Sequence, residues 1–492
     1  MTTEPEAGER SSLGTVAARG ATVTVAGQAA KFGIQFGGIV VLARLLEPSD
    51  FGLVAMVIAV VGVCEVLRDF GLSSAAVQAR TLTERQRSNL FWINTGIGAG
   101  LTLIVLLCAP LIAGLFDEPR LTSITQVLSV TFLLSGLATQ FRAHLTRQMK
   151  FGRLAVADIV AQSGGLLAGI ALAVGGAGYW AIVGQQVVQA LLMPAVTAAW
   201  GRWMPGLPHR HEPMRDLLSF GWHLMGTQLL QYASKNVDSV IVGHQFGATN
   251  LGYYNRSSQL VNGPLNQLNV PASTVALPVL SRLQDDPPRY RRFLLHGQTA
   301  LMTLVVGGFL CAAALAGPAV EILLGPSWTP ATDLFRLFAI GAAFQGAGYA
   351  TYWVFTSKGI TAAMLRYAIV VRTLSISLLV AGAWWGMIGV AWAYVVGVAL
   401  SWLLGLLWIS RASDAPVREM FANGLRTLLV YGVASTAAYT ASRLVDGPIA
   451  EVVTGIGALI ATCAVIAAGY PRYRGDLVSV RGMARLVKER AS

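Results

Sequence analysis

Amide and cationic side chains recur along one face of an otherwise apolar segment near the start of the chain. Within residues 27–46, which read GQAAKFGIQFGGIVVLARLL, the polar side chains are Gln28, Lys31 and Gln35. Spacings of three and four residues place them on one side of a helix. An ammonium group binds anions, and an amide both donates and accepts hydrogen bonds. The chemistry expected of this face is the binding of a polar, negatively charged ligand.

Two further polar stripes occur in the second half of the chain. Both follow the helical period, and they comprise Gln228, Gln231, Lys235 and Asp238 in one window and Gln259, Asn262, Asn266 and Asn269 in the next. Taken alone, each amide can simply bridge two helices. Such stripes cannot face lipid, because an unsatisfied polar group in hydrocarbon costs several kcal/mol. Together the three stripes favour a hydrated cavity lined by amides and cations.

Apart from Arg366 and Arg426, which lie near the inner ends of their windows, six cations lie inside apolar windows: Lys31, Arg68, Lys235, Arg256, Arg336 and Arg372. A carboxylate one helical turn away can neutralise three of them, through the pairs Glu65–Arg68, Asp238–Lys235 and Asp333–Arg336. Arg256 lies near the predicted outer membrane face, where its side chain can reach the headgroups. Lys31 and Arg372 stand near mid-span and need partners on other helices, such as Asp69 or Asp158, or an anion that comes and goes. The candidate cavity cations are thus Lys31, Arg68, Lys235, Arg256 and Arg372, with Glu65, Asp69, Asp158 and Asp238 as candidates for charge pairing or ion coupling.

The elements that hold these residues are long apolar helices. Of the 492 residues, 54% are hydrophobic and only 12% are charged, about half the charged share of a soluble globular protein. Windows of about 20 apolar residues can cross a bilayer as helices. Fourteen such windows occur, near residues 21–43, 51–77, 91–115, 121–141, 154–175, 179–200, 217–243, 252–280, 293–317, 331–356, 362–383, 387–409, 421–442 and 449–470. The sequence predicts an all-α polytopic membrane protein whose first span is kept, since its polar start does not resemble a signal peptide.

The positive charge of the chain is distributed unevenly between the two sides of the predicted membrane. The net charge is +12. With the N-terminus placed inside, 27 of the 36 lysines and arginines fall in inner loops and tails or, for Arg366 and Arg426, at the inner ends of their windows, and the outer loops hold only Arg44, Arg120 and Arg443. This asymmetry follows the positive-inside rule and predicts that both termini are cytoplasmic. The basic charge therefore indicates contact with membrane lipids and not with nucleic acid.

A shift of 200 residues aligns two parts of the chain. EPSDFGLVA (47–55) falls on GATNLGYYN (247–255), and the register extends without a gap from Gln28, aligned with Gln228, to Ser73, aligned with Ser273. The alignment predicts two lobes of six helices each, related by an axis along the membrane normal, with the substrate site between them. The predicted organisation is an N-terminal tail (1–20), an N-lobe (21–200), a linker (201–216), a C-lobe (217–410), two added helices (411–470) and a basic tail (471–492).

Four segments resemble the polysaccharide-transport branch of the multidrug/oligosaccharidyl-lipid/polysaccharide (MOP) exporter superfamily. They are LARLLEPSDFGLVAMVIAVVGVCEVLRDFGLSSAAVQ (42–78), MKFGRLAVADIVAQ (149–162), VDSVIVGHQFGATNLGYYNRSSQL (237–260) and LPVLSRLQDDPPRYRRFLL (277–295). The resemblance covers roughly residues 20 to 420. It implies a V-shaped, two-lobed fold that works by alternating access. The implied function is the flipping of an undecaprenyl-diphosphate-linked oligosaccharide across the bacterial inner membrane, for surface polysaccharide biosynthesis.

The resemblance also implies roles for particular residues. In relatives that flip the peptidoglycan precursor, cations on the first helix of each lobe meet the diphosphate, and two extra helices form a groove for the lipid tail. Lys31 and Lys235 occupy corresponding places here, and the two added helices at 411–470 correspond to the groove. This chain lacks the cluster of arginines that those relatives carry on their early helices. A polysaccharide polymerase and glycosyltransferases are the partners that such a function implies.

The remaining motifs do not favour an enzyme. The chain has no G-x-x-x-x-G-K-[ST] loop to bind nucleotide phosphates, HRHE (209–212) is more typical of a solvated loop than of a metal site, and no metal or cofactor is expected. Transport driven by the membrane potential, or coupled to H⁺ or Na⁺, remains open. Two alternatives also remain. A cation-coupled multidrug exporter would have an acidic cavity, and a membrane-embedded glycan polymerase would have a large outer loop.

Overall fold

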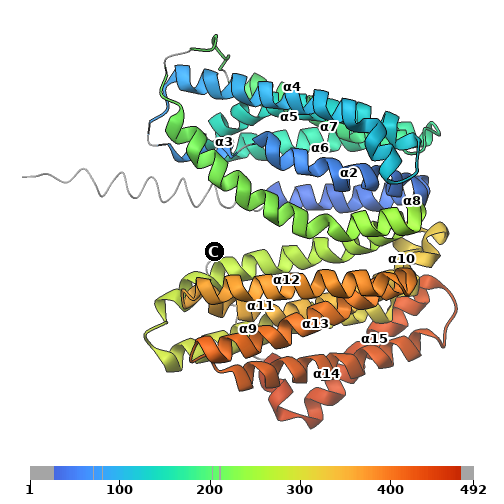
Figure 1. Cartoon of the computed structure of the whole chain (residues 1–492). Coiled ribbons are helices and arrows are strands. Elements are labelled where there is room, and N and C mark those ends of the chain that lie inside the picture. Colours follow the sequence, from blue (N-terminus) through green and yellow to red (C-terminus); the bar gives the residue numbers. More distant parts are fainter. Residues whose placement is uncertain (1–26, 70, 80, 202, 210–211, 478–492) are drawn as a thin grey trace, which may run out of the picture. The chain divides into compact units, whose positions relative to one another are not determined.

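The computed structural model describes residues 27–69, 71–79, 81–201, 203–209 and 212–477. These residues form helices and connecting loops, and no strand occurs among them (Figure 1). After a helix over residues 27–45, the helices of the first half are α2 (Pro48–Asp69), α3 (Leu72–Gln78), α4 (Glu84–Leu115), α5 (Arg120–Arg147), α6 (Phe151–Val174) and α7 (Trp180–Gly201). The described part of each predicted window of this half therefore overlaps a helix.

The second half continues the helical pattern. Its elements are α8 (Arg215–Arg282), α9 (Pro287–Ala314), α10 (Ala316–Leu324), the 3₁₀ helix η1 (Pro326–Ala331), α11 (Thr332–Ser357), α12 (Thr361–Ala383), α13 (Gly386–Ala412), α14 (Val417–Ser442) and α15 (Pro448–Gly469). The long α8 holds two predicted windows, because Gly247 adopts φ 78° and ψ 178° inside it and breaks the helix there. Glycine suits this break, since a side chain disfavours positive φ.

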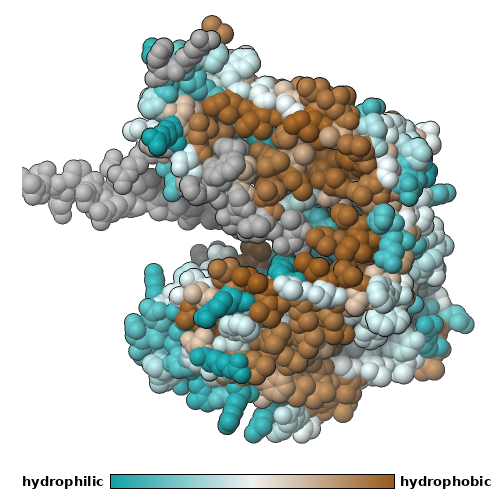
Figure 2. Space-filling model, in the orientation of Figure 1, coloured by the Kyte–Doolittle hydropathy of each residue, from teal (hydrophilic) through white to brown (hydrophobic). Residues whose placement is uncertain are grey.

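Membrane-spanning character is evident in most of these helices. Within the described residues, nine helices are long and apolar enough to cross a bilayer. Apolar side chains cover the middle of the face seen in Figure 2, and hydrophilic ones gather near the helix ends. The helices α12 and α15 bury very little of their surface inside the protein, as expected for helices that face lipid. The fold class is thus as predicted, whereas the exact number of fourteen spans remains a prediction.

Contacts group the chain into two units that divide between Gly252 and Tyr253. The first unit includes the part of α8 that follows the predicted linker at 201–216, so the predicted lobe boundaries remain a prediction. In the first unit α5 is central, because it packs against α2, α3, α4, α6 and α7. Glycines allow its close approach to α4: a Cβ on Gly98 would lie 2.6 Å from the Phe132 carbonyl oxygen, and one on Gly136 would lie 2.7 Å from that of Asn94.

In the second unit α9 and α11 form the centre. Helix α11 packs against α9 and α13, and α14 packs against α9 and α15. Trp328 and Trp353 are among the largest fully buried side chains of this unit. Beyond α15, a short helix over residues 471–477 is fixed to α14, where Arg426 Nη2 lies 2.9 Å from Asp476 Oδ1 and the Tyr473 hydroxyl donates to that of Tyr431 at 3.2 Å.

Backbone conformation supports the internal repeat independently of side-chain identity. Met149 has φ 55° and Gly359 has φ 68°, and these two left-handed residues are 210 positions apart. The residues that follow them also match, with φ/ψ of −82°/54° at Lys150 and −82°/52° at Ile360. Helix α10 and η1 lie between α9 and α11 in the second repeat. Their residues account for the increase, from 200 to 210, in the number of positions that separate equivalent residues of the two repeats. The helices α5–α6 and α11–α12 are therefore equivalent parts of the two repeats.

A reciprocal contact joins the repeated segments near Gly52 and Gly252. A Cβ on Gly52 would overlap the carbonyl oxygen of Ala248, and a Cβ on Gly252 would overlap that of Pro48. The two contacts are equivalent under the shift of 200, because Gly52 corresponds to Gly252 and Pro48 corresponds to Ala248. All four residues belong to the first unit. Such an exchange of contacts is what a local two-fold relation between equivalent segments produces.

Candidate functional site

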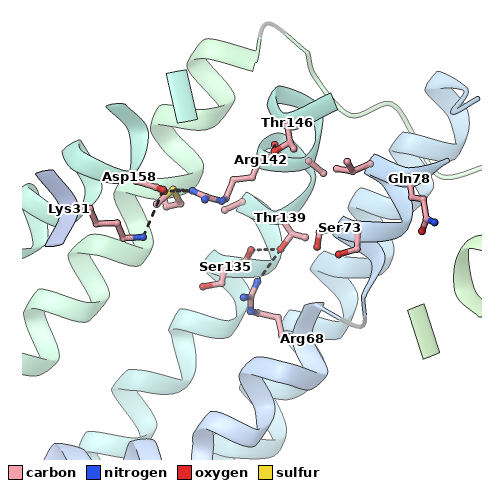
Figure 3. A pocket seen from close by; sticks show the side chains of 14 residues that line it. Lys31, Arg68, Ser73, Gln78, Ser135, Thr139, Arg142, Thr146 and Asp158 are labelled. Atoms are coloured by element: carbon pink, nitrogen blue, oxygen red, sulfur yellow. Dashed lines mark hydrogen bonds and ion pairs between the residues drawn. The ribbon is translucent and has the colours of Figure 1, made fainter. Parts of the chain in front are cut away.

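A polar pocket of about 740 Å³ lies within the first unit (Figure 3). It is enclosed by the helix over residues 27–45 and by α2, α3, α5, α6 and α7. Its lining residues are Lys31, Arg68, Ser73, Ser74, Val77, Gln78, Ser135, Ala138, Thr139, Arg142, Ala143, Thr146, Asp158 and Met193. The volume falls in the range typical of ligand sites, about 300–1,000 Å³.

Asp158 on α6 is shared by two cations of this pocket. Lys31 Nζ lies 3.9 Å from Asp158 Oδ2, and Arg142 Nη1 on α5 binds Asp158 Oδ1. The same Arg142 Nη1 lies 3.0 Å from the sulfur of Met193 on α7. Figure 3 shows Lys31 and Arg142 reaching the carboxylate from two sides. One carboxylate therefore holds two cations whose side chains are still more than one third exposed.

Arg68 at the end of α2 provides a third cation. Its Nε donates to Glu65 Oε2 at 3.1 Å, and its Nη1 donates to the Thr139 hydroxyl at 3.0 Å. Thr139 in turn donates to the Ser135 carbonyl at 2.9 Å. The Arg68 side chain is only 17% exposed, so this network fixes the position of its guanidinium group. An exposed part of Arg68 still borders the pocket.

Backbone contacts hold the elements around the pocket. The Gln162 amide of α6 donates to the Lys31 carbonyl at 3.2 Å and thereby ties α6 to the first helix. Arg147 in the last turn of α5 donates to the carbonyl oxygens of Ala76 and Ala79. Ala76 lies in the last turn of α3 and Ala79 directly follows the helix, where backbone carbonyls lack partners inside it. The short α3, whose serines and Gln78 line the pocket, is thus held against α5.

The arrangement suits an anion that carries more than one negative charge. Three cations line the pocket against the single carboxylate of Asp158. The guanidinium group of Arg142 can form two parallel hydrogen bonds with a phosphate, while Lys31 acts as a point charge. The hydroxyls of Ser73, Ser74 and Thr146 lie alongside. An anion entering the pocket would compete with Asp158 for the same two cations.

This competition gives a testable expectation for Asp158→Asn. The substitution removes the internal anion while keeping the size of the side chain, so we expect inorganic diphosphate to bind the purified protein about 5- to 50-fold more tightly, as for a lost charge-assisted contact. Isothermal titration calorimetry in nanodiscs measures the change. Glu321→Gln, which removes an exposed carboxylate outside the pocket, should leave the affinity unaltered. Weaker binding by Asp158→Asn would show that Asp158 does not compete with the anion.

The other candidate residues of the first unit are placed as follows. Gln28 and Gln35 lie exposed on the first helix and are not among the residues that line the pocket. Gln228 is exposed, and Asp238 is half-buried and accepts a hydrogen bond from the backbone N–H of Ser239 at 2.9 Å. The side chains of Asp69, Gln231 and Lys235 lie outside the described part of the chain, so their predicted roles stay predictions.

In the second unit the candidates lie mainly along α8. Arg256 donates to the Gln259 side chain at 2.7 Å, and Asn262 donates to the Ser258 hydroxyl at 2.9 Å. Asn266 is exposed on α8, and Arg372 is exposed on α12. Asn269 is 2% exposed and lines a separate pocket. A chamber shared by these residues and Lys31 remains a prediction.

Arg142 is the residue that sequence reasoning missed. The predicted window ended at residue 141, which assigned Arg142 to an inner loop, whereas α5 continues to Arg147. A signal was available, because the polar residues Ser135, Thr139, Arg142 and Thr146 are spaced by four, three and four positions. That spacing places them on one face of a helix.

Comparisons with known proteins relate this chain to surface-polysaccharide proteins. A family described as "Polysaccharide biosynthesis protein" matches residues 41–333. The lipopolysaccharide biosynthesis protein WzxC of Escherichia coli (strain K12) is 23% identical over 314 residues, 63% of this chain and 63% of that protein. The succinoglycan biosynthesis transport protein ExoT of Rhizobium meliloti (strain 1021) is 25% identical over 309 residues, again 63% of each chain. The matches thus span somewhat less than two thirds of these relatives.

Solved structures share the fold. The lipid II flippase MurJ in an inward closed conformation gives a TM-score of 0.72 at 14% identity, covering 91% of this chain and 99% of that one. An inward-facing multidrug resistance MATE family transporter of the MOP superfamily gives 0.60 at 13% identity, covering 80% and 96%. The fold is therefore that of a multi-pass membrane transporter, as the sequence resemblance implied.

Proposed function

The chain belongs to the polysaccharide biosynthesis protein family, and on that premise we propose that it is a flippase for a lipid-linked oligosaccharide. The proposed substrate is a glycan repeat unit joined to undecaprenyl diphosphate, moved across the bacterial cytoplasmic membrane by alternating access. Both termini are then cytoplasmic. A polysaccharide polymerase and glycosyltransferases are its proposed partners.

The observation that carries this proposal is the cationic pocket. Lys31, Arg68 and Arg142 project from helices of a membrane protein into one cavity. Charged side chains at membrane depth are costly and usually mark a substrate or ion pathway. A diphosphate carries the charge that these cations can neutralise, while a lipid tail attached to it can remain in hydrocarbon. The proposal accounts for the excess of cations over carboxylates in the pocket.

The pocket also suggests how a cycle proceeds. With no anion bound, Asp158 keeps Lys31 and Arg142 in place. The diphosphate then displaces Asp158 and binds the same two cations. A membrane potential that is negative inside favours outward movement of an anion by ~2.3 kcal/mol per charge per 100 mV, about 4–5 kcal/mol for two charges. Coupling to H⁺ or Na⁺ through Glu65, Asp69 or Asp158 is the alternative driving force.

The proposal is tested with Lys31→Ala and Lys235→Ala, singly and together, in cells that depend on this protein for surface glycan. Lys31→Ala removes one of the two cations held by Asp158, so we expect at least about a tenfold loss of surface glycan at equal protein level. The double variant should export less than either single variant. Arg289→Ala removes an exposed cation outside the pocket and is the matched control. Normal export by the double variant would mean that both lysines are structural.

A multidrug exporter of the same superfamily is the second candidate, because a MATE transporter shares the fold. The positive charge of the residues that line the first pocket argues against drug export. A cationic drug would meet three cations and one carboxylate in the pocket of the first unit. Efflux of a cationic dye, measured in the same cells, separates the two functions.

A further inference from the structure

A second pocket, of about 450 Å³, lies within the second unit between α8 and α11. Its lining includes Asn269, Ser273, Thr274 and Leu277 from α8, and Tyr349 and Tyr352 from α11. No charged side chain lines it among the described residues. Its polar groups are amide and hydroxyl groups, and its volume again falls in the range of ligand sites.

The second pocket is the repeat equivalent of the cationic pocket. With the shift of 200, Ser73, Ser74 and Val77 correspond to Ser273, Thr274 and Leu277. With the shift of 210 fixed by the backbone at Met149 and Gly359, α5 corresponds to α11. Both repeats therefore use the same two elements to build a cavity, although the cavities lie in different units.

The lining of the two pockets differs where α5 and α11 contribute. Under the shift of 210, Thr139 corresponds to Tyr349 and Arg142 to Tyr352. The main cation of the first pocket is thus replaced by an aromatic ring, and Tyr352 is 43% exposed. An aromatic face attracts apolar C–H groups and neutral rings, whereas a guanidinium group attracts anions.

Free hydrogen-bonding capacity accompanies this ring. The Asn269 amide lies buried beside the Tyr349 hydroxyl, and its nitrogen and oxygen have almost no accessible surface. The Ser273 hydroxyl accepts from Trp353 Nε1 at 2.9 Å, which leaves its own proton to donate. A hydroxyl donor therefore lies next to an exposed aromatic face.

We propose that this pocket binds one pyranose ring of the transported glycan, and the inference rests on the proposed flippase function. The apolar C–H face of the sugar packs on Tyr352, and one of its hydroxyls accepts a hydrogen bond from Ser273. In this proposal the pocket of the first unit recognises the charge of the substrate, and the pocket of the second unit recognises its sugar. A neutral lipid tail fits less well, because it would leave the Ser273 hydroxyl proton without an acceptor.

The test uses the full-length protein in nanodiscs prepared without alkyl-glycoside detergent. Saturation-transfer NMR measures binding of methyl glycosides of glucose, galactose, mannose and N-acetylglucosamine, and calorimetry measures binding of inorganic diphosphate. Tyr352→Ala should weaken sugar binding about two- to tenfold, as for the loss of an aromatic contact, and should leave diphosphate binding unchanged. Tyr352→Phe keeps the ring and should retain most of the sugar signal. Tyr470→Ala, which removes a similarly exposed tyrosine outside the pocket, is the matched control.

The outcomes separate this proposal from the one on which it rests. Absence of sugar signal in the native protein, or an equal signal in Tyr352→Ala with unchanged melting temperature, would overturn the sugar pocket. Loss in Tyr352→Phe equal to that in Tyr352→Ala would contradict packing against the ring. Failure of diphosphate binding would count against the flippase function, whatever the sugars do.

Discussion

Replacing Arg142 with alanine is expected to reduce surface-glycan export by about ten- to a hundredfold at equal protein level. Arg142 is the cation that binds Asp158 directly and also contacts Met193. A hydrogen bond to a charged group contributes about 1.5–3 kcal/mol, which corresponds to that range of affinity. The variant removes both the proposed contact to the diphosphate and the partner that positions Asp158. Quantitative immunoblotting of surface glycan measures the effect.

Two companion variants identify the cause of that loss. Arg142→Lys keeps the positive charge but not the planar, two-pronged geometry, so it should restore export only in part. Arg289→Ala, outside the pocket, should export normally. Wild-type export by Arg142→Ala would remove the cationic pocket from the proposed mechanism. Equal loss in Arg142→Lys and Arg142→Ala would show that geometry matters more than charge.

Replacing Gly52 with alanine is expected to destabilise the protein by about 1–3 kcal/mol or more, the usual cost of overpacking. A Cβ at Gly52 would overlap the carbonyl oxygen of Ala248, and backbone atoms cannot rotate away as a flexible side chain can. Gly252→Ala should have a similar effect, because its Cβ would overlap the carbonyl of Pro48. Thermal unfolding in detergent, together with the amount of protein in the membrane, measures both.

The control for these glycines is Gly37→Ala. A Cβ at Gly37 meets no atom within 4 Å, and alanine favours a helix over glycine by about 1 kcal/mol. This variant should therefore be as stable as the native protein or slightly more so. If Gly52→Ala and Gly37→Ala melted at the same temperature, the reciprocal contact between the repeated segments would not be a tight one.

The helices could be predicted because their signal is local. In the described part of the chain, each window predicted from hydropathy overlaps a helix, and the windows separate the two parts of α8, where Gly247 breaks the helix. Pairs within one helix could be predicted for the same reason. Arg68 Nη2 lies 3.0 Å from Glu65 Oε2, and Arg336 Nη1 lies 2.6 Å from Asp333 Oδ1. Both pairs form because side chains at i and i+3 are neighbours on any helix.

Contacts between helices could not be fixed in this way. Asp158 was one of two acids considered for Lys31, and only the rotation of α6 toward the first helix decides between them. The prediction missed Arg142 because an apolar window ends at the first charged residue, although helix α5 continues to Arg147. The tyrosine pocket was missed because Tyr349 and Tyr352 carry no charge and look like ordinary apolar-window residues. Only the shift of 210 between α5 and α11 reveals their relation to Thr139 and Arg142.

Transfer of a fluorescent polyprenyl-diphosphate glycan between the leaflets of proteoliposomes tests the central claim most directly. A membrane-impermeant reductant reports the fraction in the outer leaflet. We predict that the native protein accelerates transfer, that excess inorganic diphosphate slows it, and that Arg142→Ala and Lys31→Ala abolish most of it. Equally fast transfer by these variants, or of a glycan on an uncharged polyprenyl carrier, would contradict recognition of the anion by the cationic pocket.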